Sequence, residues 1–105
     1  QARRADRKLR VEVAWPLFVP PGWTTADQPI ARMALAVAGQ LSGKPARLRM
    51  TAGFTDLHFL TADGGIPAIG YGADGSGAHS DFECVKLSEL AHAARFYAEM
   101  MLRME

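Results

Sequence analysis

Hydrophobic and polar residues recur along this chain with two different periods, which divide it into expected strands and helices. Between residues 9 and 15, apolar side chains alternate with charged or small ones, as in a strand with one face in water. The next apolar residues fall on one helical stripe, made of Ile30, Met33, Ala34, Val37, Ala38 and Leu41. We expect Asp27 to cap this helix, Pro29 to lie in its first turn and Gly43 to end it.

The following stretch predicts a strand, a short helix and a second strand. The first strand is expected at residues 47–53, where arginines alternate with apolar side chains. Thr55 or Asp56 then opens a helix of about two turns, which Gly64-Gly65 closes. The mostly apolar run at residues 66–71 is typical of a buried strand in an α/β sheet.

A long helix is expected from Ser88 to the C-terminus. Its predicted inward face contains Leu87, Leu90, Ala91, Ala94, Tyr97, Ala98 and Met101. The alternation of strands and helices predicts the α/β fold class. In open α/β sheets, functional sites lie in polar loops that follow the ends of buried strands. Residues 51–85 contain such loops, so we expect a functional site there.

The composition excludes several classes of function. Its 105 residues, 49% hydrophobic and 22% charged, allow at most one ordinary globular domain, and no apolar run reaches the roughly 18–20 residues that span a bilayer. The net charge is +1 and the basic excess lies in the first ten residues, so neither nucleic-acid binding nor membrane association is expected. No apolar segment of a signal peptide follows this basic start, which favours a cytoplasmic location. Cys84 is the sole cysteine, which excludes an internal disulfide and a four-cysteine zinc site.

Residues 70–75 match the glycine fingerprint of dinucleotide-binding loops, but their context differs. The pattern Gly70-x-Gly72-x-x-Gly75 follows an expected strand, yet no helix opens on its last glycine. The helix amides that would hold a pyrophosphate are therefore missing. We interpret Gly70 and Gly72 as positions where a ligand or another segment approaches the backbone closely.

The loop after these glycines carries a candidate for metal or acid–base chemistry. His79 lies near Asp81 and Glu83, where an imidazole could face a cleft or simply be solvated. One histidine cannot form a zinc site, because structural sites use four protein ligands and catalytic sites usually three. A self-contained site built from His58, His79, Asp81 and Glu83 is the weakest alternative.

Four stretches together resemble one family of metal-dependent hydrolases. They are Thr55-Asp56-Leu57-His58-Phe59-Leu60, Gly65-Ile66-Pro67-Ala68-Ile69-Gly70-Tyr71-Gly72, Ala78-His79-Ser80 and Glu83-Cys84-Val85. In order and spacing they resemble the C-terminal part of the zinc-dependent exopeptidases and deacylases that include acetylornithine deacetylase, succinyl-diaminopimelate desuccinylase, aminoacylase and glutamate carboxypeptidase. The resemblance covers residues 23–105 well and residues 1–22 less specifically.

This resemblance implies a domain organisation. Residues 23–105 would be the C-terminal part of a three-layer catalytic domain, in which helices flank a mixed β-sheet. Residues 1–22 would be the end of a lid, or dimerisation, domain and the strand that returns from it. A homodimer formed through the lid domain is common in the family.

The resemblance also implies a mechanism and a set of site residues. Two zinc ions, with cobalt or manganese as alternatives, share a water that a glutamate activates for attack on an amide carbonyl. His79 would be a metal ligand. Thr55, Asp56 and the backbone at Gly70 and Gly72 would line the substrate side of the cleft.

The sequence departs from the family pattern in three places. His58, which we place in the substrate wall, stands where the family often has an arginine, so substrate selectivity does not carry over. Asp81-Phe82-Glu83 replaces the common Pro-Asp-Glu, and only Glu83 agrees. The His-x-Asp, the bridging aspartate and the Glu-Glu pair of the family belong to its N-terminal half, so no catalytic residue is expected in this sequence.

We therefore expect the C-terminal portion of a dinuclear-zinc amide hydrolase, a deacylase or exopeptidase acting on N-acyl amino acids or small peptides. The portion alone would be inactive, and the missing N-terminal catalytic half would be its partner. The alternative is a non-catalytic α/β binding or assembly module derived from the same fold.

Overall fold

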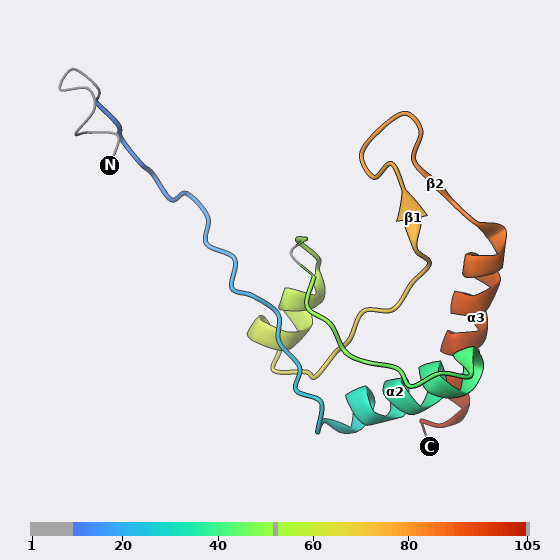
Figure 1. The fold of residues 1–105 in the computed structure, drawn as a ribbon. Helices are drawn as coiled ribbons and strands as arrows, with labels where there is room; N and C mark the ends of the chain where they lie inside the picture. Colours follow the sequence, from blue (N-terminus) through green and yellow to red (C-terminus); the bar gives the residue numbers. More distant parts are fainter. Residues whose placement is uncertain (1–9, 52, 105) are drawn as a thin grey trace.

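The main packing contact of the molecule joins two helices, α2 and α3 (Figure 1). The computed structural model describes residues 10–51 and 53–104. In this part of the chain the elements are the helices α2 (Pro29–Ser42) and α3 (Leu87–Leu102), the π-helical segment η1 (Phe59–Asp63), and the strands β1 (Gly75–Ser76) and β2 (Cys84–Val85).

Local sequence signals explain both ends of α2. Pro29 occupies the first helical position, where its missing N–H costs little, and Gly43 ends the helix in the left-handed conformation with φ +66°. The N-cap is Gln28, so the expectation that Asp27 caps the helix was wrong. The Asp27 carboxylate instead accepts a hydrogen bond from the Thr25 hydroxyl, which lowers the pKa of Asp27.

The core lies where α2 meets α3. Its buried members are Ala34, Val37, Phe96 and Met100, with Ile30, Met33, Ala38, Leu41, Ile69 and Tyr71 partly buried around them. The predicted stripe of α2 is thereby confirmed. The ring of Tyr71 stacks on Phe96 with centroids 3.6 Å apart. Burial, reinforced by the nearby Glu89 carboxylate, raises the pKa of Tyr71.

The face that α3 buries differs from the predicted one. Ala93, Phe96 and Met100 are buried, whereas Leu87 and Met101 from the predicted face are 81% and 69% exposed. The buried face is displaced by one position along the helix, or about 100° of rotation. Apolar residues occur on more than one stripe of α3, so the contact with α2 decides which stripe is buried.

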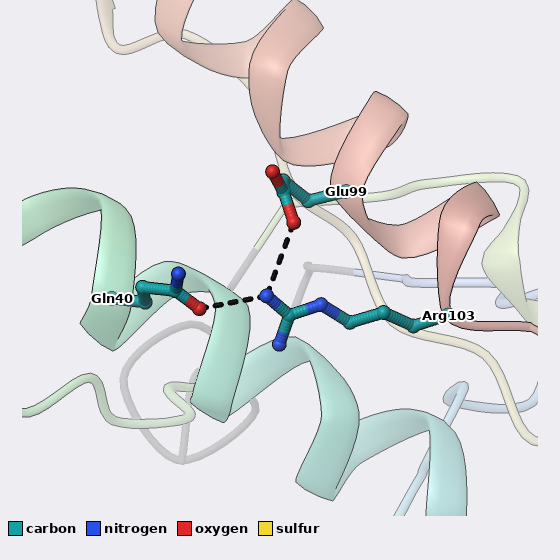
Figure 2. A network of polar contacts seen from close by, with 3 residues as sticks. All are labelled: Gln40, Glu99 and Arg103. Carbon is teal, nitrogen blue, oxygen red and sulfur yellow. Dashed lines mark hydrogen bonds and ion pairs between the residues drawn. The ribbon is translucent and has the colours of Figure 1, made fainter.

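A polar contact near the last turn of α3 ties this helix to α2. Arg103 Nη2 lies 2.7 Å from Gln40 Oε1 of α2 and 3.1 Å from Glu99 Oε2, one turn earlier on α3 (Figure 2). Exposed ion pairs contribute at most about 1 kcal/mol. This contact therefore orients the two helices, while the apolar core supplies most of the stabilisation.

Three expected strands are not formed in the described part of the chain. The segments 9–15, 47–53 and 66–71 contain no strand and have no ladder partner among the described residues, and Leu9 and Ala52 lie outside those residues. A strand forms only where a neighbouring strand takes up its N–H and C=O groups. Within residues 10–51 and 53–104 the ladder of β1 and β2 is the sole strand pairing, so these residues form a mixed α/β fragment.

The short helix expected after Thr55 and Asp56 is present, with a π-helical core. A helical turn at Leu57 leads into η1, and the Gly64 N–H donates to the carbonyl of Phe59, five residues earlier, at 2.9 Å. Gly64 is the C-cap, as predicted.

Two contacts fix the segment before α2 against the later part of the chain. The Thr24 hydroxyl donates to the carbonyl of Ala68 at 2.6 Å and accepts from its N–H at 3.0 Å. A Cβ at Gly22 would lie 2.8 Å from Thr61 Oγ1, so only glycine lets the backbone approach the short helix this closely. The segment before α2 therefore packs on the helix that follows Asp56.

Candidate functional site

A short hairpin carries His79. Strands β1 and β2 pair antiparallel, with Gly75 opposite Val85 and Ser76 opposite Cys84. The hydroxyl oxygen of Ser76 and the thiol sulfur of Cys84 are 3.2 Å apart across this pair. Figure 1 shows the loop between the strands projecting away from the helices. The ladder thus fixes both ends of the loop.

Two consecutive turns shape this loop. The Ser80 N–H donates to the Gly77 carbonyl at 2.9 Å, and the Glu83 N–H donates to the Ser80 carbonyl at 3.1 Å. The Ser80 hydroxyl reinforces both turns, because it donates to the Gly77 carbonyl at 2.6 Å and accepts from the Phe82 N–H at 3.3 Å. Gly77 has φ +70°, and a Cβ there would lie 2.9 Å from the Phe82 carbonyl oxygen. The loop backbone is therefore held by its own hydrogen bonds.

His79 occupies the third position of the first turn in a conformation that favours glycine. Its φ is +63°, and among the described residues it is the one non-glycine with positive φ. This conformation costs an L-residue about 1–2 kcal/mol. The His79 N–H donates to Glu83 Oε2 at 3.2 Å, while the side chain is exposed. The contact uses the backbone, so it leaves the ring nitrogens of His79 available to a ligand.

The described residues do not complete a metal site. No group of three or more His, Cys, Asp and Glu side chains in residues 10–51 and 53–104 is placed to hold an ion. A self-contained site of His58, His79, Asp81 and Glu83 is therefore not formed there. The chemistry of His79 fits a single metal ligand, since its exposed imidazole is a common zinc donor and its backbone is fixed.

A cavity of about 500 Å³ lies between the hairpin and the start of α3. Its lining residues are Ala73, Gly75, Ser76, Ala78, Glu83, Cys84, Val85 and Leu90. The predicted site residues Thr55, Asp56, His58, Gly70, Gly72 and His79 are not among them. The described residues thus do not bring the predicted site together in this cavity.

Thr55 and Asp56 lie on a separate turn that His58 closes. His58 is only 5% exposed, and its Nδ1 lies 3.0 Å from the Thr55 carbonyl oxygen. The ring of His58 packs on Phe59 with centroids 3.9 Å apart. Thr55 and Asp56 are exposed beside it. The substrate-binding roles of all three residues stay predictions.

The two glycines interpreted as sites of close approach differ in their surroundings. A Cβ at Gly70 would lie 3.3 Å from Leu57 Cδ1, so another segment does approach there. A Cβ at Gly72 would meet no atom within 4 Å. At Gly72 the approach of a ligand stays a prediction.

Sequence reasoning missed the contact between Glu83 and the His79 backbone, and the part that Ser80 plays in both turns. The signal available was spacing, because Ser80 lies three residues after Gly77 and Glu83 three residues after Ser80. This is the interval of a turn hydrogen bond.

Comparison with known families identifies the class of protein. The family model described as Peptidase family M20/M25/M40 matches residues 8–103, nearly the whole chain. The chain therefore belongs to this family, which indicates a metal-dependent hydrolase of the metallopeptidase type. The match supports the motif resemblance at this level and singles out none of the members named above. No curated protein and no solved structure is significantly similar to the chain.

None of the helices in the described ranges is sufficiently long and apolar to cross a bilayer.

Proposed function

We propose that this chain supplies the C-terminal part of a dinuclear-zinc amide hydrolase and that His79 is one of its metal ligands. The observation that carries the proposal is an exposed histidine with positive φ on a hydrogen-bonded hairpin, in a chain that belongs to a metallopeptidase family. Strained backbone that is held by surrounding contacts is concentrated at ligand-binding and catalytic sites.

The metal site requires ligands beyond this hairpin. Bound zinc would supply Lewis-acid chemistry at an amide carbonyl and would lower the pKa of a bound water to about 7. Catalytic zinc sites usually use three protein ligands. The remaining ligands and the glutamate base would come from an N-terminal catalytic half, as the family resemblance implies. Cobalt or manganese stays an alternative, because one imidazole does not select among these ions.

The substrate would be an N-acyl amino acid or a small peptide. In the proposed cleft the exposed Thr55 hydroxyl and Asp56 carboxylate would bind polar groups of the substrate, on the turn that His58 holds. The backbone at Gly70 and Gly72 would form the adjoining wall. The proposal includes a three-layer catalytic domain from residue 23 onward, a lid domain that ends at residue 22, and a homodimer.

A non-catalytic binding module is the second candidate. It is compatible with the observation that the described residues contain no cluster of three or more His, Cys, Asp and Glu side chains placed to hold a metal ion. The number of zinc ions bound per protein distinguishes the hydrolase from the binding module, because the module requires no zinc.

Native mass spectrometry of the intact, zinc-supplemented protein tests the proposal. We expect two zinc ions per active site, and we expect His79→Ala to remove one of them. Loss of a single ligand should also lower the affinity for that ion at least about 100-fold, since second-shell changes alone cost 10- to 100-fold.

His92→Ala is the matched control. His92 is a half-buried histidine on α3 and not on the hairpin. This variant should keep both ions. If His79→Ala also kept both ions with unchanged affinity, His79 would not be a ligand, and a wild-type protein without zinc would favour the binding module.

A further inference from the structure

We propose that Glu83 is a positioning residue that acts through the backbone N–H of His79 and so presents the imidazole in its ligating orientation. This inference rests on the proposed function, because it assigns to Glu83 a part in the same site. The contact that carries it is the hydrogen bond from the His79 N–H to Glu83 Oε2, at 3.2 Å.

The backbone of His79 requires such a constraint. Its φ of +63° is uncommon for a non-glycine residue and is favoured where neighbouring contacts hold the backbone. The turn bonds described above fix Gly77, Ser80 and Glu83, but none of them uses the N–H or the carbonyl of His79. The Glu83 carboxylate is the group that bonds His79 directly.

Glu83 is itself well anchored. It directly precedes Cys84 of β2, which pairs with Ser76 of β1. Its own N–H is bonded to the Ser80 carbonyl at 3.1 Å. The ladder therefore fixes Glu83, and Glu83 fixes the residue that carries the proposed ligand.

The chain offers both a conservative variant and a matched control. Glu83→Gln keeps an acceptor oxygen, whereas Glu83→Ala removes it. Asp81→Ala deletes another exposed carboxylate from the same loop, and no hydrogen bond from Asp81 to His79 is present among the described residues. The two alanine variants change the net charge equally, so a difference between them reports the hydrogen bond.

The first measurement is amide hydrogen exchange at His79 in the metal-free intact protein. Glu83→Ala should accelerate this exchange about 3- to 10-fold, because the amide loses its acceptor while the site is exposed. Glu83→Gln and Asp81→Ala should leave the rate within about twofold of the wild type.

The second measurement is the zinc affinity of the same variants by calorimetric titration. Glu83→Ala should weaken binding about 10-fold, in the range of changes to residues that orient metal ligands. Glu83→Gln should restore most of this loss, and Asp81→Ala should change little.

The outcomes separate this inference from the proposed function. Equal losses in Glu83→Gln and Glu83→Ala, or in Asp81→Ala and Glu83→Ala, would assign the effect to charge and overturn the positioning role. Unchanged exchange in Glu83→Ala would overturn it as well, even if His79→Ala still lost zinc. Faster exchange in Glu83→Ala together with full zinc binding by His79→Ala would instead reject the ligand assignment and leave the backbone contact standing.

Discussion

At the residue scale, His79 has a backbone conformation that glycine adopts more readily than histidine. Glycine adopts φ values near +63° without steric cost, whereas histidine does not. A glycine at this position would relax the loop but would remove the imidazole. A side chain retained at such a cost is expected where it binds something.

We predict that His79→Gly is more stable than His79→Ala by about 1 kcal/mol, because alanine meets the same clash as histidine at positive φ. Both variants lose the imidazole, so the comparison isolates backbone strain. Urea unfolding of the two variants measures the difference.

The pair Asp81→Gly and Asp81→Ala is the control for this comparison, since Asp81 is not among the residues with positive φ. In that pair alanine should be the more stable, by about 0.4–1 kcal/mol, because it restricts the unfolded chain. If the alanine variant were the more stable one at both positions, the backbone at His79 would not be strained.

At the element scale, the parts that could be predicted from sequence are those that local signals determine. Helix α2 has Pro29 at its start, Gly43 after its end and one apolar stripe between them, and each of these acts within the helix itself. The segment 66–71 has the composition of a strand, but pairing depends on a neighbour that the described residues do not provide. The sequence therefore indicates that residues 66–71 could form a strand, but it does not provide the partner strand.

In the candidate site, too, features set by local sequence could be predicted and features set by distant contacts could not. His79 and its loop could be proposed as a site from the motif, because the residue types and spacing are local, and the metal-ligand role stays a prediction. The burial of His58 could not, since it depends on Gly22 approaching the short helix from 36 positions earlier in the chain. The contact of Glu83 with the His79 N–H depends on the left-handed backbone conformation of His79. The pattern of apolar and polar residues does not predict that conformation.

The corrected face of α3 leads to a test on stability. Phe96 is 2% exposed in the core and stacks on Tyr71, so Phe96→Ala should lower the free energy of unfolding by about 3–5 kcal/mol. Leu87→Ala, on the face that the sequence pattern favoured, should change it by less than about 0.5 kcal/mol. Chemical denaturation of both variants shows which face of α3 is buried. A larger loss of unfolding free energy for Leu87→Ala than for Phe96→Ala would support the face predicted from the sequence.

At the scale of the whole molecule, the chain leaves more surface exposed than a compact protein of its mass. Its accessible surface is 9400 Å², against about 5,800 Å² expected for a folded protein of 11.4 kDa. The radius of gyration is 19.4 Å, against about 13 Å for a compact chain of this length. Figure 1 shows the extended segment before α2 running away from the helices, and Trp15 and Phe18 on it are exposed.

Part of this exposed surface lies beside the segment 66–71. A mostly apolar cavity of about 290 Å³ lies between parts of this segment and α3 and is lined by Ile66, Ile69, Phe96, Met100 and Met101 among others. Apolar surface of this kind is normally covered in a stable fold. The proposed N-terminal catalytic half would cover it by pairing a strand with residues 66–71 in the mixed sheet.

This pairing predicts which amides become protected. The N–H groups of successive strand residues point to opposite edges, and the Ala68 N–H already bonds the Thr24 hydroxyl on one edge. If residues 66–71 form a strand in the completed protein, the amides of Ile69 and Tyr71 would face the other edge, where the new strand would lie. Hydrogen exchange at these two amides should slow about 100-fold or more when the 105-residue chain is joined to the N-terminal half. The Ala68 amide, bonded in both states, should change far less. If all three amides exchanged equally fast in both states, residues 66–71 would not be a sheet strand, and the three-layer catalytic domain would lose its support.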